Sequence, residues 1–225
     1  MIQLKHVSKV YDNNIVALDN IDLEVKEGEL VILKGVSGSG KSTILSLIAG
    51  VLKPTSGDVL VDKKHIAKLP DHFSSQYRRD NIGFIFQKYN LIPTLSVEEN
   101  IMLPLVPLNL DEEDLQEKLM HVMNMFTIVH KKEVIVKKLS GGEQQRTAIA
   151  RANVNNPKII LADEPTANLD QKLSCEFIQI LKKLKSLHKT IIVATHDPLF
   201  FDLDFVDKVI EMHNGKLQRQ PVVCS

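Results

Sequence analysis

Gly35-Val36-Ser37-Gly38-Ser39-Gly40-Lys41-Ser42-Thr43 fits the pattern G-x-x-x-x-G-K-[ST], and it lies between an apolar run and a helical pattern. The run before it, residues 30–33, has the length and branching of a buried strand, and the apolar residues after it repeat with helical spacing. The glycines allow a tight turn in which several amide N–H groups point into one concavity, and the helix start adds a positive dipole. The stretch therefore predicts a phosphate-binding loop.

The residue types of this loop indicate a nucleoside triphosphate with Mg²⁺. We expect Lys41 to reach the β- and γ-phosphates and the Ser42 hydroxyl to be a hard oxygen ligand for Mg²⁺. The other predicted nucleotide contacts in the loop are Gly35, Ser37, Gly38, Ser39, Gly40 and Thr43. The alternative is a glycine-rich turn that only caps a helix, and the flanking strand and helix argue against it.

A second apolar strand, residues 159–162, ends in two adjacent carboxylates, Asp163 and Glu164. Side chains alternate along a strand, so the two acids can point in different directions. We expect Asp163 to hold a Mg²⁺-bound water and Glu164 to polarise the water that attacks the γ-phosphate. A solvated strand end is the alternative. Ligands bind at the carboxyl edge of open α/β sheets, and this favours the catalytic interpretation.

A third motif, Leu139-Ser140-Gly141-Gly142-Glu143-Gln144-Gln145-Arg146, contains an S-x-x-E capping box at the start of a helix predicted to run to about Asn153. Such a helix start binds anions, and its predicted contacts are Ser140, Gly141 and Gly142. One nucleotide is already served by the first loop. The second helix start is therefore expected to serve a nucleotide held by another copy of the chain, which implies a homodimer.

In order and spacing, these motifs resemble the ATPase subunits of ATP-binding cassette (ABC) transporters over essentially the whole chain. Four further positions belong to the same pattern: Tyr11, Gln87 after residues 82–86, Asp170 in Asn168-Leu169-Asp170, and His196 after residues 191–195. Taken singly, such residues are usually surface aromatics or satisfied polar groups. Their order and spacing together favour the functional interpretation.

The resemblance implies a role for each of these four positions. Tyr11 stacks on adenine, and His196 contacts the γ-phosphate. Gln87 completes the Mg²⁺ shell and reports to the membrane partner, and Asp170 lies at the dimer interface. The expected catalytic residues are then Glu164, His196, Lys41 and Gln87, the expected metal ligands are Ser42, Gln87 and, through water, Asp163, and the expected ligands of the chain are ATP and Mg²⁺.

The resemblance also implies the fold, an α/β P-loop NTPase core of the RecA-like kind with an N-terminal antiparallel β subdomain and an inserted α-helical subdomain. We expect one ATP-binding cassette domain over residues 1–225, with the core in 1–88 and 158–225 and the helical subdomain in 89–157. Strands are predicted at residues 2–7, 21–25, 58–61, 82–87, 159–162, 190–195, 208–212 and 216–218, and a helix at 173–187.

Within the insert, the sequence predicts a second capping box at Ser96 and Glu99, and a helix with its apolar face at Leu115, Leu119, Val122 and Phe126. The methionines Met120, Met123 and Met125 are expected to fill a core, with an adaptable docking surface as the alternative. Leu91, Ile92 and Leu95 lie in a segment interrupted by Pro93, and we expect some of them to be exposed for docking of a membrane subunit.

Residues 90–105 and 162–170 are similar to the subgroup that contains the lipoprotein-releasing ATPase LolD, the exporter MacB and the cell-division ATPase FtsE. This subgroup commonly has glycine where Ala167 stands. MacB-type exporters carry their membrane segments in the same polypeptide, so this chain is expected to be a separate subunit of an export, lipoprotein-release or mechanotransmission system. The alternatives are an FtsE-like regulator of cell-wall hydrolysis, a nucleotide-binding adaptor with little hydrolysis, and a soluble non-transport ABC ATPase.

Composition is consistent with one globular core and argues against a nucleic-acid partner. With 28 basic and 28 acidic side chains in 225 residues, there is no net charge to recruit nucleic acid. The two cysteines, Cys175 and Cys224, suggest neither a metal nor a disulfide framework, which fits a reducing cytosol. No run approaches the ~20 apolar residues of a membrane span. We therefore expect a cytoplasmic protein, bound through integral membrane subunits to the inner membrane, with transport selectivity residing in those subunits.

Overall fold

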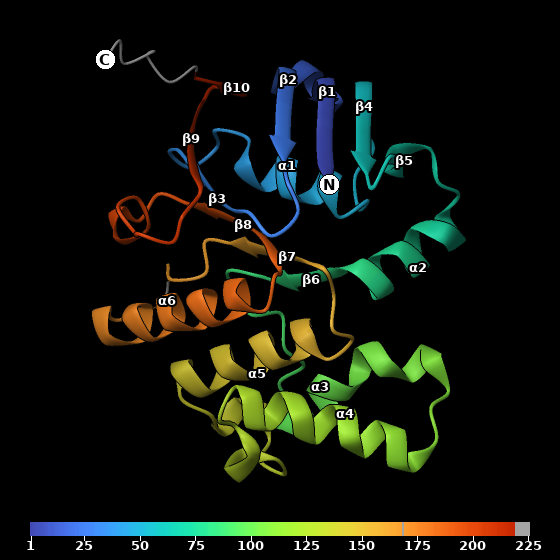
Figure 1. Ribbon diagram of the computed structural model, residues 1–225, viewed down its shortest axis with the longest axis vertical. Helices are drawn as coiled ribbons and strands as arrows, with labels where there is room; N and C mark the ends of the chain where they lie inside the picture. Colours follow the sequence, from blue (N-terminus) through green and yellow to red (C-terminus); the bar gives the residue numbers. More distant parts are fainter. Residues whose placement is uncertain (168, 219–225) are drawn as a thin grey trace.

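Two β-sheets enclose helix α1 (Lys41–Ile48), and helices α5 (Gly141–Asn153) and α6 (Gln171–Ser186) cover the far face of the larger sheet (Figure 1). The computed structural model describes residues 1–167 and 169–218. Asn168 and the predicted position Cys224 lie outside the described residues. One hydrophobic core lies between the two sheets around α1, and a second lies between the larger sheet and the helices below it. The arrangement is the α/β core with an antiparallel sheet and a helical insert that the sequence predicts.

The smaller sheet is antiparallel, with the strand order β2-β1-β4-β5. Its strands are β1 (Ile2–Tyr11), β2 (Ile15–Val25), β4 (Ser56–Val61) and β5 (Lys64–His65). The first two are longer than predicted and are joined by the short 3-10 segment η1 (Asp12–Asn14). Ile15 and Val16 are 60% and 56% exposed, so the outer part of this hairpin lacks the burial that produces an alternating pattern.

The larger sheet has the order β10-β9-β3-β8-β7-β6, and all its neighbouring strands are parallel except β10 and β9. Its strands are β3 (Leu30–Lys34), β6 (Ile82–Ile85), β7 (Ile159–Asp163), β8 (Thr190–Thr195), β9 (Lys208–His213) and β10 (Lys216–Leu217). Each was predicted, although β6 ends before Gln87. Strands covered on both faces form continuous apolar runs, and this makes them recognisable in the sequence.

Six α-helices connect these strands within the described residues. They are α1 (Lys41–Ile48), α2 (Asp71–Asn81), α3 (Val97–Met102), α4 (Glu112–Met125), α5 (Gly141–Asn153) and α6 (Gln171–Ser186). Short 3-10 segments are η2 (Ile66–Lys68), η3 (Leu103–Leu108), η4 (Val129–Lys131), η5 (Val136–Lys138) and η6 (Pro198–Phe200). Helix α2 was not predicted, because it buries only Ser74 and Tyr77 and so has no apolar stripe.

The predicted features of the helical insert are largely confirmed. Both capping boxes form, at Ser96 and at Ser140. Met123 is fully buried and Met125 packs against the same core, which supports the core-filling interpretation for these two methionines, whereas Met120 is only partly buried and belongs to neither core. Among the three residues expected to be exposed for docking, Ile92 is exposed, whereas Leu91 and Leu95 are only partly exposed, and Leu91 packs against the core. Among the described residues, no helix is both long and apolar enough to cross a membrane.

Candidate functional site

The carboxyl ends of four parallel strands meet at one edge of the larger sheet and carry the predicted site. β3 leads into the loop at residues 35–40, β7 ends at Asp163, and β8 and β6 are followed by His196 and Gln87. Strand pairing places Asp163 opposite Ala194, close to His196. Residues that are far apart in the sequence are thereby brought to a single edge, where open α/β sheets bind their ligands.

The loop has the shape of a backbone cradle that only glycine can form. Gly40 has φ 104°, and a Cβ on Gly35 would lie 2.5 Å from the Met212 carbonyl oxygen and 2.7 Å from Ser39 Oγ. The Ser39 hydroxyl is buried and has no hydrogen-bond partner among the described residues. A buried hydroxyl without a partner is costly. A phosphate oxygen in the cradle would satisfy it, so the loop fits the predicted ligand.

Lys41 curls back over the loop and is 4% exposed. Its ammonium donates to the carbonyl oxygens of Gly35 at 2.6 Å and Val36 at 3.1 Å, and it lies 3.3 Å from Glu164 Oε1. These three oxygen partners match the three donors of an ammonium group. A triphosphate that binds Lys41 must therefore take the place of at least one of them.

Glu164 lies between Lys41 and His196. Its φ is 44°, and its amide donates to the Ala194 carbonyl, so the chain turns sharply after Asp163 and the two acids point in different directions. One carboxylate oxygen, Oε2, is 2.9 Å from His196 Nδ1, and the other faces Lys41. This is the bridging position expected of a carboxylate that handles a proton beside a phosphate group.

Asp163 pairs instead with the loop serine. Ser42 Oγ donates to Asp163 Oδ1 at 2.9 Å. Burial raises the pKa of the Asp163 carboxyl, the Ser42 hydrogen bond opposes this rise, and the negative charge of Glu164 adds to it. A divalent cation near Oδ1 would favour the ionised form.

The oxygens available here fit Mg²⁺ better than a fully protein-enclosed metal. Ser42 supplies a hydroxyl, Asp163 a carboxylate, and the exposed Gln87 an amide at the next strand end. In residues 1–167 and 169–218 there is no cluster of three or more His, Cys, Asp or Glu side chains arranged to hold a metal. Mg²⁺ usually keeps several waters and takes one or two protein oxygens together with substrate phosphates, which agrees with this sparse set.

Tyr11 lies beside the first turn of α1. Its hydroxyl is 3.4 Å from Thr43 Oγ1, its side chain is exposed, and the Lys9 ammonium lies 5.3 Å from its ring centroid. An exposed ring next to the phosphate loop is available for stacking with a base. The position is compatible with the predicted adenine contact.

The second predicted anion site stands apart from this group. Ser140 hydrogen bonds to Glu143 of its own helix, and the described residues show no hydrogen bond from Ser140 or Asp170 to Lys41 or Glu164. A Cβ on Gly141 would meet nothing within 4 Å, whereas one on Gly142 would lie 2.7 Å from Leu173 Cδ2. Gly141 therefore faces open space, while Gly142 packs against α6.

Asp170 and Glu143 also have local structural roles at the starts of two helices. Asp170 caps α6 by accepting a hydrogen bond from the Leu173 amide. The pKa of Glu143 is lowered because its carboxylate accepts a hydrogen bond from the Ser140 amide and forms an ion pair with the Lys131 ammonium at 3.1 Å. A stable cap holds the start of α5 in place without involving Gly141.

The sequence patterns did not indicate several residues that support the site. Thr166 donates to Asp197 Oδ2 at 2.9 Å, which ties the segment after Glu164 to the one after His196. Gln145 donates to the Pro165 carbonyl at 3.1 Å. The adjacency of Asp197 to His196, and the place of Gln145 in the third motif, are the only sequence signals that could have suggested them.

Comparison with known proteins places the chain among ATP-binding cassettes. Residues 18–167 match the protein family described as ABC transporter. An uncharacterized ABC transporter ATP-binding protein of Methanocaldococcus jannaschii, MJ0796, is 42% identical over 98% of this chain and 96% of its own length. A dimeric structure of MJ0796 in a post-hydrolysis state with ADP and Pi has a TM-score of 0.89 at 41% identity and covers 97% of both chains. The macrolide export ATP-binding/permease protein MacB of Campylobacter jejuni is 38% identical over 96% of this chain and 33% of its own length.

Proposed function

The chain belongs to the ABC transporter family and is an ATPase of that family, and from this premise we propose that it energises a membrane complex of the LolD/MacB type from the cytoplasmic face of the inner membrane. The observation that carries the proposal is the placement of Glu164 between Lys41 and His196, beside the Ser42–Asp163 pair. This arrangement combines phosphate binding with a carboxylate able to accept a proton. An export, lipoprotein-release or mechanotransmission role is consistent with the resemblance to MacB.

Each group in the site has a separate proposed role in ATP hydrolysis. The loop amides and Lys41 would hold the β- and γ-phosphates of ATP, with Lys41 exchanging Glu164 for a phosphate oxygen. Glu164 would then orient and deprotonate the attacking water, and His196 would donate a hydrogen bond to the γ-phosphate. When bound through Ser42, Gln87 and a water on Asp163, Mg²⁺ would neutralise charge that develops on the phosphates.

We propose that the catalytic unit is a homodimer in which each nucleotide also contacts the Ser140–Gly141 helix start of the second copy. The open space at Gly141 supports this, because an anion can approach the α5 amides there. The dimeric structure of the 41% identical MJ0796 with ADP and Pi supports it further. Asp170 would lie at the same interface and Tyr11 would stack on adenine.

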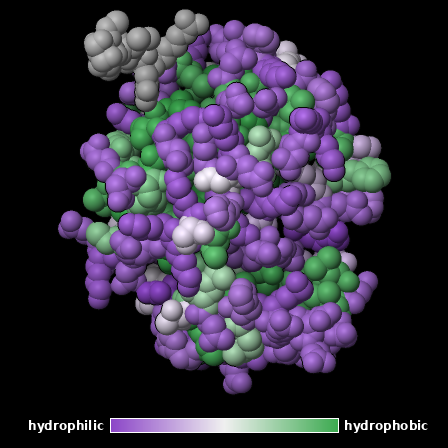
Figure 2. Space-filling model, in the orientation of Figure 1, coloured by the Kyte–Doolittle hydropathy of each residue, from purple (hydrophilic) through white to green (hydrophobic). Residues whose placement is uncertain are grey.

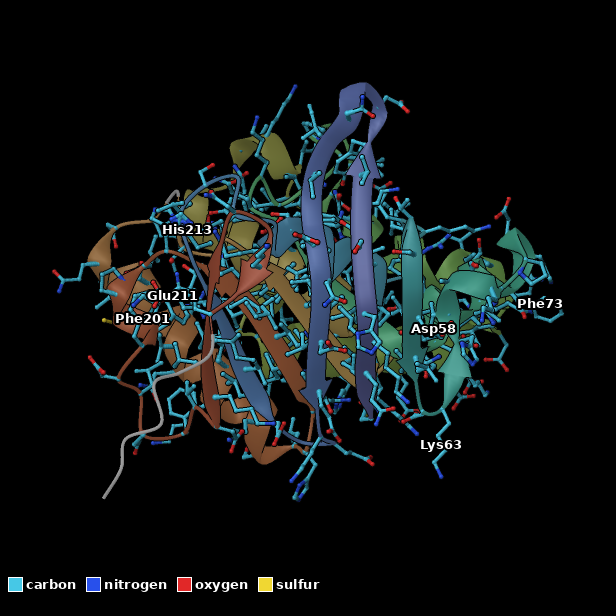
Figure 3. All side chains as sticks on the ribbon, turned by 90° about the horizontal axis from the view of Figure 1, so that it is seen from above. Asp58, Lys63, Phe73, Phe201, Glu211 and His213 are labelled. Atoms are coloured by element: carbon cyan, nitrogen blue, oxygen red, sulfur yellow. The ribbon has the colours of Figure 1, made fainter. Side chains whose placement is uncertain are left out.

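A groove between α2 and the helical insert is the proposed docking surface for the membrane subunits. It has a volume of about 540 Å³ and is lined by α2, β6, η3 and the end of α5. Phe73 and Val106, which are next in sequence to the lining residues His72 and Pro107, are 55% and 59% exposed. Figure 2 shows hydrophobic surface over η3, and Figure 3 shows Phe73 at the outer edge of the molecule. Such a groove is suited to a short amphipathic helix.

The experiment is a paired substitution, Phe73→Ser with Val106→Ser, in the purified chain and in the membrane complex. We expect normal folding and basal ATP hydrolysis, with loss of co-purification with the membrane subunits and of stimulation by them. Leu187→Ser is the matched control, since Leu187 is 47% exposed at the far end of α6. Normal stimulation of the paired variant would show that the membrane subunits dock elsewhere.

A further inference from the structure

The loop that follows Gln87 holds two residues in a costly backbone conformation. Tyr89 has φ 60° and Asn90 has φ 49°, the left-handed region that favours glycine, and a bulky residue such as tyrosine is rare there. The Tyr89 amide donates to the Phe86 carbonyl at 3.0 Å. The Asn90 amide donates to the Lys88 carbonyl at 2.6 Å. Both amides of the turn are thus bonded locally, and both of its carbonyl groups are left to find partners elsewhere.

Arg151 supplies those partners from helix α5. Its Nη1 donates to the Asn90 carbonyl and its Nη2 to the Tyr89 carbonyl, each at 2.6 Å. The Arg151 side chain is partly buried, and burial lowers the pKa of its guanidinium. A planar fork can hold two successive carbonyls at once, which the single ammonium of lysine does less well. The fork therefore suits this left-handed turn in particular.

The side chain of Tyr89 does not hold the turn by hydrogen bonding. It is 9% exposed, and its hydroxyl is buried without a hydrogen-bond partner among the described residues. Strain at two residues and a buried hydroxyl both oppose this conformation. The two Arg151 hydrogen bonds are the side-chain contacts to the turn's backbone that help offset them.

Helix α5 connects this turn with the rest of the proposed machinery. It begins at the Ser140 capping box, Gln145 in its second turn donates to the Pro165 carbonyl next to Glu164, and Arg151 lies in its last turn. Arg151 also lines the groove between α2 and the insert. Helix α5 therefore carries the Ser140 capping box at its start, contacts the segment after Glu164 through Gln145, and contacts both the groove and the Gln87 loop through Arg151.

We propose that Arg151 is a positioning residue that fastens the Gln87 loop to α5, so that a displacement of α5 at its Ser140 end is transmitted to Gln87. This inference rests on the proposed function, in which Ser140 meets the nucleotide of a second copy and Gln87 faces the membrane subunits. Without the fork, the strained turn relaxes and the loop no longer follows the helix.

Amide hydrogen exchange on the full chain measures the fastening directly. In Arg151→Gln we expect the Tyr89 amide to exchange about ten- to a hundredfold faster, the effect of losing charge-assisted hydrogen bonds, while β3 and β8 stay protected. Arg151→Lys should show a smaller increase. Lys189→Gln is the matched control, because Lys189 also donates to two oxygens at 2.6 Å, Asn156 Oδ1 and the Pro157 carbonyl, but near the start of β8.

The transmission is tested by repeating the exchange measurement with Mg²⁺-ATP. The unsubstituted chain should change protection at residues 86–90 when ATP is added, and Arg151→Gln should not, although its ATP affinity is retained. If the loop of Arg151→Gln and Arg151→Lys exchanges at the unsubstituted rate, or still responds fully to ATP, the inference is wrong. If one variant does not fold, the other provides the measurement.

A double-substitution cycle with Gln87→Ala separates this inference from the proposed function. If Arg151 acts through Gln87, then Arg151→Lys combined with Gln87→Ala should hydrolyse ATP no more slowly than Gln87→Ala alone, and the two should shift the Mg²⁺ dependence alike. Additive losses would overturn the inference. An unaltered rate and Mg²⁺ dependence in Gln87→Ala would instead remove Gln87 from the proposed catalytic set, while the exchange experiment still decides the role of Arg151.

Discussion

Replacing Glu164 with glutamine separates ATP binding from ATP hydrolysis. The amide oxygen can accept from Lys41 as the carboxylate does, and the amide nitrogen can donate to His196 Nδ1 when the ring proton is on Nε2, at the positions where the carboxylate oxygens lie 3.3 and 2.9 Å from those nitrogens. The geometry is thus preserved while the proton acceptor is lost. Loss of a positioned base typically slows the reaction by about 10²–10⁴-fold, or about 2.7–5.4 kcal/mol in the activation free energy.

The same substitution should strengthen ATP binding. In the resting site the Glu164 carboxylate competes with phosphate for the 4% exposed Lys41. A hydrogen bond to a charged group is stronger than one to a neutral group by about 1 kcal/mol, so the amide is easier for phosphate to displace. We therefore expect about fivefold tighter ATP binding and accumulation of ATP-bound dimer.

Phosphate release at saturating Mg²⁺-ATP gives kcat, and calorimetric titration gives the affinity. Glu133→Gln, at an exposed carboxylate of the insert, is the control for a general loss of charge and should leave both unchanged. A Glu164→Gln protein that turns over at the rate of the unsubstituted chain would refute the assignment of the base. Weaker ATP binding would refute the competition between carboxylate and phosphate.

Three further predictions use the same measurements and a stability assay. Lys41→Ala should weaken ATP binding by about ten- to a hundredfold, since it removes charge-assisted bonds, and an unchanged affinity would mean that the loop does not hold the triphosphate. Gly141→Asp should leave ATP binding by the monomer unchanged but block ATP-driven dimerisation, and normal dimerisation would contradict the shared-site arrangement. Mixing the Gly141→Asp and Lys41→Ala proteins should restore some ATP hydrolysis if one intact composite site is sufficient. The Asp207 carboxylate accepts hydrogen bonds from the Leu30 amide and the Lys185 ammonium. Burial alone would raise the pKa of Asp207, but these two partners lower it below the ordinary 3.8. Asp207→Asn should therefore cost about 1 kcal/mol of unfolding free energy at pH 7. Urea titrations should show this difference shrinking as the pH falls from about 4 through the lowered folded-state pKa, and a difference that does not shrink over the acid range in which the chain stays folded would contradict it.

The buried strands and the principal site residues could be predicted because their signals are local. Strands β3, β7 and β8 lie within a residue of their predicted ends, since burial on both faces produces uninterrupted apolar runs. The phosphate loop, the Asp163–Glu164 pair and the Ser140 cap are each contained in fewer than ten consecutive residues. Their meeting at one sheet edge follows from parallel strand order.

Features that depend on distant contacts had no such signal. Helix α2 is polar along most of its length and is fixed by contacts such as the Tyr77 hydroxyl with the Ile48 carbonyl. The Lys41–Glu164 ion pair and the Arg151 fork join segments from different parts of the chain, the latter 61 residues apart. Only the packed fold determines which side chains meet in such cases.

The two glycines at the start of α5 carry separate constraints although they are neighbours. At Gly141 a side chain would project into open space, so the chain itself tolerates change and only assembly with another molecule restricts it. At Gly142 an alanine must already displace the Leu173 side chain, and anything larger must push α5 and α6 apart. Inactive variants at the two positions should therefore belong to different classes, with a stable but unassembled protein at the first and a poorly expressed, heat-labile protein at the second.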